Sequence, residues 1–200
     1  HRQSGTLFFK GEQIHANNLT AAVNEGIVYV PEDRKQRGLF LDLPIRENIT
    51  MGSLKLHSIA GIVNKKSEQA VVADMVKRMN IKARSVEQYV GTLSGGNQQK
   101  VVVGNWLNTN PSVMFFDEPS RGIDVAAKQQ IFKIMWDQSR KGISSELEEL
   151  LEVCQRILIM CEGKIVGEVN PDEVQTNELY ALCMGDSSEG KTEEVPSENV

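Results

Sequence analysis

The sequence predicts an α/β fold with a largely parallel sheet and a small antiparallel β part. Two short, wholly apolar runs, at residues 27–30 (IVYV) and 113–116 (VMFF), indicate strands whose two faces are both buried. A helical pattern over 94–108 precedes the second run, and another over 124–138 follows it. Apolar strands that alternate with helices are typical of parallel sheets covered by helices.

Composition sets limits on both size and function. The 200 residues are 40% hydrophobic and 24% charged, which is ordinary for a globular domain with a sizeable core. The net charge of −5 disfavours a nucleic-acid-binding protein, which usually carries a basic face. No apolar run approaches the roughly 20 residues that span a bilayer, and the first residues do not resemble a signal peptide. Any membrane association is therefore expected to be peripheral.

Local patterns predict the elements before residue 80. A β-hairpin is expected over 6–15, turning at residues 10–12, because two short strand-like segments flank Gly11. The 67–79 pattern predicts a helix with Val71, Met75 and Met79 on one face. The other elements expected here are a helix at 19–25, a polar loop at 32–38 and a helix at 45–54.

The last third of the chain is predicted to form a smaller α+β part followed by a tail. An antiparallel pair is expected at 156–161 and 164–168, turning at Glu162 and Gly163. Helices are expected at 146–153 and 172–184, and residues 186–200 are predicted to be a disordered tail because they are almost free of apolar side chains. The cysteines, at 154, 161 and 183, lack metal-ligand spacing, so we expect buried thiols in a reducing cytoplasm.

Two carboxylates follow the strand at 113–116. In open α/β sheets ligands lie at the carboxyl ends of strands, so Asp117 is placed to hold Mg²⁺, usually through water. The adjacent Glu118 can then orient or polarise a water for in-line attack on a γ-phosphate. For this segment alone, a solvated acidic turn is the competing interpretation.

A second segment, at 93–100 (LSGGNQQK), opens the helix predicted over 94–108 with an anion-binding pattern. Ser94 is a good N-cap, and Gly95 and Gly96 allow backbone N–H groups to approach a ligand. The helix dipole favours an anion at this end. An ordinary Ser-Gly-Gly turn is the alternative. The apolar face that should dock this helix consists of Val102, Val103, Trp106 and Leu107.

Taken together, the two segments resemble the signature and Walker B motifs of the ATP-binding-cassette (ABC) ATPases, a class of P-loop NTPases. Residues 120–124 (SRGID) resemble the D-loop of that family, which meets the opposite cassette across the dimer interface. Residues 29–35 (YVPEDRK), 38–39 (GL) and 46–49 (RENI) are similar to the second cassette of ATPases that drive ribose-, galactose- or xylose-type importers. The resemblance covers about residues 5–184.

The resemblance implies a composite ATP site. Asp117 would bind Mg²⁺, and Glu118 and Ser145 would be catalytic. Glu32 stands where most cassettes carry the Gln of the Q-loop, which senses nucleotide. The resemblance implies that residues at the signature and the D-loop bind ATP, namely Ser94, Gly95, Gly96, Gln98 and Asp124. Partners would be a second cassette and a membrane permease, at the cytoplasmic face of the membrane, with no direct contact to sugar.

Three departures from the family pattern affect the expected activity. The P-loop pattern G-x-x-x-x-G-K-[ST] is absent from these residues, so the cassette, over 1–185 with a helical subdomain at 45–108, is expected to lack its Walker A part. Ser145 stands where the switch histidine usually lies, and the strand expected before Ser144 is missing. We therefore expect weak or no ATPase activity from the chain alone.

Two other functions were weighed against an importer ATPase. A degenerate cassette that only dimerises or docks is favoured by the absent P-loop and histidine, whereas the intact Asp117, Glu118 and signature favour a working protein. An ABC protein acting on DNA or ribosomes is disfavoured by the acidic balance. The basic residues Arg34, Lys35 and Arg37 could contact a membrane subunit or phosphates, or simply lie in a solvated loop. Trp106 and Trp136 are expected in the core.

Overall fold

The computed structural model describes residues 5–14, 18–138, 151, 154–161 and 163–184. Its α-helices are α1 (Leu19–Asn24), α2 (Ile45–Thr50), α3 (Lys65–Arg78), α4 (Gly95–Leu107), α5 (Val125–Gln138) and α7 (Thr176–Met184). Its strands are β1 (Leu7–Phe9), β2 (Glu12–Ile14), β3 (Ile27–Val30), β4 (Ser58–Ile59), β5 (Ile62–Val63), β6 (Val113–Phe116), β7 (Ile157–Cys161) and β8 (Lys164–Val169). Short 3₁₀ turns span Met51–His57, Val90–Thr92 and Pro171–Glu173, and a π-helical turn spans Arg34–Gly38.

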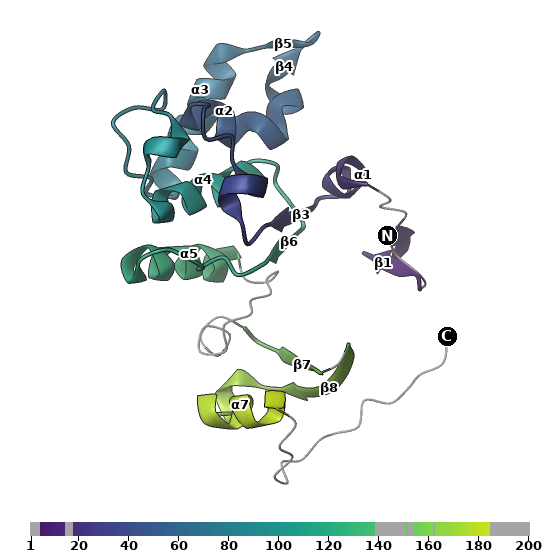
Figure 1. Ribbon diagram of the computed structural model, residues 1–200. Helices are drawn as coiled ribbons and strands as arrows, with labels where there is room; N and C mark the ends of the chain where they lie inside the picture. The colour runs from purple at the N-terminus through teal and green to yellow at the C-terminus, as the bar shows by residue number, and fades with distance from the viewer. Residues whose placement is uncertain (1–4, 15–17, 139–150, 152–153, 162, 185–200) are drawn as a thin grey trace.

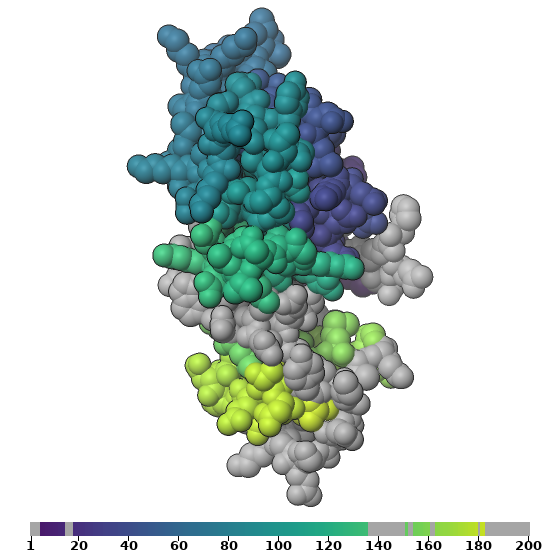
Figure 2. Space-filling model, turned by 60° about the vertical axis from the view of Figure 1, so that its left-hand side comes forward, coloured from purple at the N-terminus to yellow at the C-terminus, as the bar shows by residue number. Residues whose placement is uncertain are grey.

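The elements stack in layers around α4 (Figure 1). Helices α2 and α3 and the β4–β5 hairpin form a helical part at one end, and α4 leads from it to β3 and β6. In the space-filling view, the green surface of α5 lies between that helical part and the yellow-green surface that contains α7 (Figure 2). No helix within the described ranges is long and apolar enough to cross a membrane.

Strands β3 and β6 pair in parallel, with Ile27 opposite Val113 and Val30 opposite Phe116. The other three strand pairs in the described residues are antiparallel. The mixed α/β class is therefore confirmed, with its parallel part carried by β3 and β6. The expectation that both faces of these strands are buried is wrong. Tyr29 and Phe115 are 41% and 42% exposed, because in the described residues α4 packs on the opposite face only.

Helix α4 forms where predicted and lies at the centre of the core. Ser94 caps its first turn, and the valines at 101–103 are fully buried among side chains of α2, α3 and the two parallel strands. Trp106 and Leu107 are half-buried at the margin of the same core, as the predicted apolar face requires. The side chain of Trp136 lies outside the described residues.

The helical part departs from the prediction in two respects, the end of α2 and the buried face of α3. Helix α2 ends at Thr50 and continues as a 3₁₀ turn, where the amide of Gly52 donates to Asn105 Oδ1 at 2.9 Å. The fully buried apolar positions of α3 include Val72, whereas Val71 is half-buried. The buried face of α3 is rotated relative to the predicted one, because it includes Glu68, which is buried and forms an ion pair with Arg46.

A small hairpin, β4–β5, was not predicted because each of its strands has two residues. Its turn residues, Ala60 and Gly61, both have positive φ, the conformation that tight two-residue hairpin turns require. The β1–β2 and β7–β8 hairpins, α1 and α5 form as predicted. Helix α7 begins at Thr176 rather than 172, because a 3₁₀ turn occupies Pro171–Glu173.

A second, smaller hydrophobic cluster joins β7, β8 and α7. Ile157, Ile159 and Leu179 are its buried members. Cys154 packs against both this cluster and the main core, and burial raises the pKa of its thiol. Three predicted features lie outside the described residues: the position of Ser145, the helix at 146–153 except for Leu151, and the tail at 186–200.

Candidate functional site

The carboxyl ends of β3 and β6 bring the first candidate carboxylate to the edge of the sheet. The amide of Asp117 donates to the carbonyl of Val30 at 3.0 Å, so the parallel pairing extends one residue past β6. Its carboxylate accepts a short hydrogen bond from the Tyr29 hydroxyl. This bond raises the pKa of Tyr29, and burial and the charge of Asp117 act in the same direction. Asp117 is thus held in place by the neighbouring strand.

Glu118 starts the turn after β6 in a strained backbone conformation. Its φ is 42°, in the left-handed region that non-glycine residues seldom occupy. The Arg121 amide closes the turn by donating to the Glu118 carbonyl at 3.1 Å. The Arg121 guanidinium lies 3.6 Å from the Glu118 carboxylate and forms an ion pair with Glu32. Two candidate site carboxylates, from the loops after β3 and β6, therefore share one cation.

Arg34 connects the loop after β3 to the turn after β6. Its two terminal nitrogens donate to the carbonyls of Arg121 at 2.8 Å and Gly122 at 3.1 Å. Burial lowers its pKa, partly opposed by the charge of Asp33. Of the three basic residues in this loop, Lys35 and Arg37 are exposed, whereas Arg34 is half-buried and its guanidinium is engaged by the backbone of a distant turn.

The amino end of α4 carries the serine and the two glycines predicted to approach a ligand. Ser94 is exposed, and its hydroxyl accepts from the Asn97 amide at 3.5 Å. A Cβ on Gly95 would lie 2.8 Å from Arg34 Nη2, and one on Gly96 would lie 2.2 Å from the Cβ of Ala127. The Gly96 position therefore requires glycine for packing within the chain, whereas at Gly95 the nearest atom is the end of the Arg34 side chain.

The remaining candidate residues have structural partners of their own. Asp124 caps α5, its Oδ1 accepting from the Ala127 amide at 2.9 Å. Gln98 is 4% exposed, and its amide donates to the carbonyl of Val90 at 3.2 Å, so its side chain faces inward. Lys100 is also buried and donates to the Asn80 carbonyl at 2.9 Å; burial lowers its pKa. Ser145 lies outside the described residues.

The structure brings Glu32, Asp117 and Glu118 together at one edge of the parallel pair. The sequence patterns did not indicate the role of Tyr29, which belongs to a strand expected to be buried on both faces, or that of Arg34. A signal for Tyr29 existed in the period of two along a strand, which places residues 27 and 29 on the face opposite Val28 and Val30.

The residues at this edge suit Mg²⁺ bound together with a phosphate ligand. No group of three or more His, Cys, Asp or Glu side chains in the described ranges could form a protein-only cage. Mg²⁺ is commonly held by one or two carboxylates plus substrate phosphates and water. Asp117, fixed by Tyr29 at the strand end, can supply one such ligand.

Comparison with known sequences identifies the family. The family described as ABC transporter matches residues 1–121. The chain belongs to this family. Among curated relatives, the ribose import ATP-binding protein of a Bacillus cereus strain is 41% identical over 187 residues, covering 91% of this chain and 38% of the relative. The protein of the same name from Lactococcus lactis subsp. cremoris is 42% identical over 188 residues, covering 92% and 38%. The chain therefore spans under half the length of these curated ABC relatives.

Solved structures confirm the ABC ATPase fold. A nucleotide-free ATP-binding cassette from an ABC transporter superposes with a TM-score of 0.71 at 19% identity, covering 89% of this chain and 74% of that chain. A dimeric cassette in a post-hydrolysis state with ADP and Pi superposes with a TM-score of 0.67 at 18% identity, covering 84% and 74%. At these identities the likeness concerns the fold alone.

Proposed function

We propose that this chain is part of the ATP-hydrolysing energy subunit of a bacterial importer for simple sugars, and that it corresponds to the second cassette of that subunit. The two relatives described above carry ribose import in their names, and they match over nine-tenths of the chain. The observation that supports this function most directly is the joint placement of Glu32, Asp117 and Glu118 at the carboxyl ends of β3 and β6.

In this proposal the carboxylates divide the work of hydrolysis. Asp117 binds Mg²⁺, whose role is to neutralise charge on the transferred phosphate. Glu118 accepts a hydrogen bond from the attacking water and orients it. Glu32 senses nucleotide from the loop after β3. Ser145, which the sequence places at the switch position, would contact the same phosphate.

The amino end of α4 serves a different nucleotide, that of the partner cassette. The exposed Ser94 and the amides of the first turn present hydrogen-bond donors and the positive end of the helix dipole. Gly95 and Gly96 keep this end free of side chains, while Gln98 supports it from inside through Val90. Asp124 would meet the partner through the turn after β6. Each nucleotide would then be held between two cassettes.

The remaining parts of the proposal concern assembly. The partners are a second cassette and a membrane permease, and the chain lies at the cytoplasmic face of the membrane without contacting sugar. Because the 200 residues contain no P-loop pattern, we expect the isolated chain to bind ATP weakly. Calorimetric titration with Mg-ATP measures this directly. Tight stoichiometric binding would show that other residues grip the phosphates.

A chimera tests the function. The segment of the Bacillus cereus relative that matches this chain is replaced by the chain, and ATP-driven ribose uptake is measured in vesicles with the permease of that relative. We expect uptake, and we expect Glu118→Gln to lower ATP hydrolysis by at least about a hundredfold while ATP still binds. Lys77→Met, which removes an exposed charge on α3, is the matched control.

Two results would contradict the proposal. Hydrolysis by Glu118→Gln at the rate of the parent chimera would exclude Glu118 as the residue that orients water. A chimera that assembles with the permease and binds ATP, yet never hydrolyses it, would favour the alternative of a non-catalytic docking module.

A further inference from the structure

Three segments that are distant in the sequence meet at the guanidinium of Arg34. Arg34 itself lies in the π-helical turn after β3, which is capped by Asp33 through the amides of residues 35 and 36. The second segment is the turn after β6, represented by the carbonyls of Arg121 and Gly122. The third is Gly95, the first residue of α4, where an added Cβ would lie 2.8 Å from Arg34 Nη2.

The geometry of these contacts is that of a clamp rather than of a surface ion pair. Both acceptors are backbone carbonyls, and each is reached by a different terminal nitrogen of one planar group. A guanidinium has a fixed fork of donors, so two such bonds set the orientation of the turn as well as its distance. The position of a built Cβ on Gly95 also lies 3.1 Å from the Gly122 carbonyl, so the three segments are packed together without a spacer.

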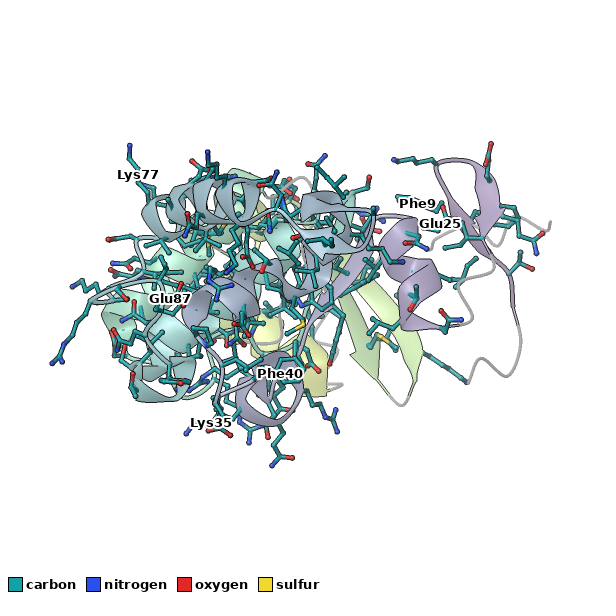
Figure 3. All side chains as sticks on the ribbon, turned by 90° about the horizontal axis from the view of Figure 1, so that it is seen from above. Phe9, Glu25, Lys35, Phe40, Lys77 and Glu87 are labelled. Carbon is teal, nitrogen blue, oxygen red and sulfur yellow. The ribbon has the colours of Figure 1, made fainter. Side chains whose placement is uncertain are left out.

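Burying the Arg34 guanidinium at this place costs free energy, and this cost must be offset by the bonds that the group makes. Its Nε is buried and has no hydrogen-bond partner among the residues that the structure describes. A donor left unpaired inside a protein is unfavourable, and charge-assisted bonds to carbonyls are among the stronger compensations. Lys35, the next residue in the same turn, is exposed and lies at the outer edge of the molecule (Figure 3).

We infer that Arg34 is a positioning residue that fixes the start of α4 and the turn after β6 relative to the loop after β3. The three segments then move as one unit, and a displacement of the loop that carries Glu32 shifts the residues at 94–96 and 121–124 with it. This inference rests on the proposed function, in which the first segment senses this cassette's nucleotide and the other two contact the partner cassette. Arg34 touches neither nucleotide in this scheme and acts through the backbone it holds.

Amide hydrogen exchange of the nucleotide-free chain tests the clamp. The variants are Arg34→Met, which removes both bonds, and Arg34→Lys, which keeps the charge but not the fork, with Lys35→Met as the matched control. The informative amides are those of Gln98, which donates to the Ser94 carbonyl, and of Arg121 and Ile123, which close the turn after β6. We expect their exchange to rise by at least about tenfold in Arg34→Met and by less in Arg34→Lys, because bonds to charged donors are worth more than neutral ones. Exchange at 101–103 should not change.

The results separate a clamp from a general loss of stability. If Arg34→Met raises amide exchange throughout α4, the exchange pattern of Arg34→Lys distinguishes the two cases. A rise in Arg34→Lys confined to the start of α4 and the turn after β6 supports the inference. A uniform rise in both variants, or no rise in either, overturns it, as does the same local rise in Lys35→Met. Because no nucleotide is present, these outcomes are independent of the ATPase assignment.

A second readout connects the clamp to function in the ribose-uptake chimera. Arg34→Met should lower kcat for ATP hydrolysis at least about tenfold with KM changed less than about threefold, because the residue contacts no nucleotide. A rise in KM at constant kcat would overturn the positioning role. Ser94→Arg, at the exposed end of α4, tests the proposed function separately, and its full activity would remove the signature assignment while leaving the exchange result intact.

Discussion

Replacing Gly96 with alanine should destabilise the fold itself. The added methyl would lie 2.2 Å from the Cβ of Ala127, against an optimum of about 3.5–4.0 Å for two carbons. Gly96 is buried and Ala127 is 9% exposed, so α4 and α5 must move apart by more than about 1 Å to relieve the overlap.

The expected size follows from two opposing effects. Overpacking of this kind costs about 1–3 kcal/mol, whereas alanine gains up to about 1 kcal/mol over glycine in a helix. Because a 2.2 Å approach is a severe overlap, the upper part of the overpacking range applies. The net loss in free energy of unfolding is then about 1–2 kcal/mol, which lowers Tm by roughly 2–8 °C in a chain of this size. Urea denaturation followed by tryptophan fluorescence measures it.

The double variant Gly96→Ala/Ala127→Gly makes the test specific. Moving the methyl from one helix to the other should recover about 1–2 kcal/mol relative to the sum of the two single variants. Wild-type stability for Gly96→Ala would refute the steric reasoning, and so would simple additivity in the double variant. Wild-type stability of the Gly96→Ala chain, combined with loss of ATP hydrolysis when the same substitution is made in the ribose-uptake chimera, would instead indicate that the ligand requires glycine at this position.

Three further predictions concern the cap of α5, the thiol between the two clusters and the ion-pair network of α2 and α3. Asp124→Ala should lower the free energy of unfolding, measured by urea denaturation, by about 1 kcal/mol. Asp124→Asn should lower it by only a few tenths of a kcal/mol, because asparagine also caps helices. Equal losses in the two variants would contradict the capping role. Burial raises the pKa of the Cys154 thiol, so less thiolate is present at pH 8 than in free cysteine. Alkylation of Cys154, followed by peptide mass spectrometry, should therefore be slower at pH 8 than alkylation of free cysteine and should accelerate above pH 9. An alkylation rate equal to that of the free amino acid would refute this reasoning. Arg46→Met should lower stability by about 2–3 kcal/mol, because Glu68 is 3% exposed and loses its cation. The hydrogen bond from Arg46 also lowers the pKa of Glu87 below its ordinary value of 4.5. This ion pair therefore stabilises the fold above that pH, and the stabilisation is lost as pH falls through the pKa of Glu87 in the folded chain. The free energy of unfolding of Arg46→Met should therefore decline less steeply in acid than that of the wild type, and an unchanged slope would contradict the pairing.

The sequence predicted most of the elements because their signals are local. Ser94 caps α4 as its residue type suggests, and the apolar runs at 27–30 and 113–116 form strands. The helix pattern of α3 was found, but its phase was not, since the burial of Glu68 depends on Arg46 in another helix. Local pattern cannot supply that information.

The candidate site divides in the same way. The carboxylates of Asp117 and Glu118 were found because they follow an apolar strand, which is a local signal. Their partners were not found: Tyr29 reaches Asp117 only because β3 and β6 lie side by side, and Arg34 reaches Gly122 only through tertiary packing. The likeness of residues 29–35 to a known family marked this loop as noteworthy without showing what its arginine does.

The division of the interior into two hydrophobic clusters affects how the molecule loses its structure. Within the described residues, the main core includes nineteen buried side chains and the cluster of β7, β8 and α7 only three, and Cys154 packs against both. Regions with few buried contacts open at lower free energy than the rest of a protein, so melting need not be a single all-or-none event. An enthalpy measured by calorimetry would then exceed the van't Hoff value from one optical signal. Tryptophan fluorescence, with Trp106 in α4, follows the large cluster, whereas far-ultraviolet dichroism averages over both.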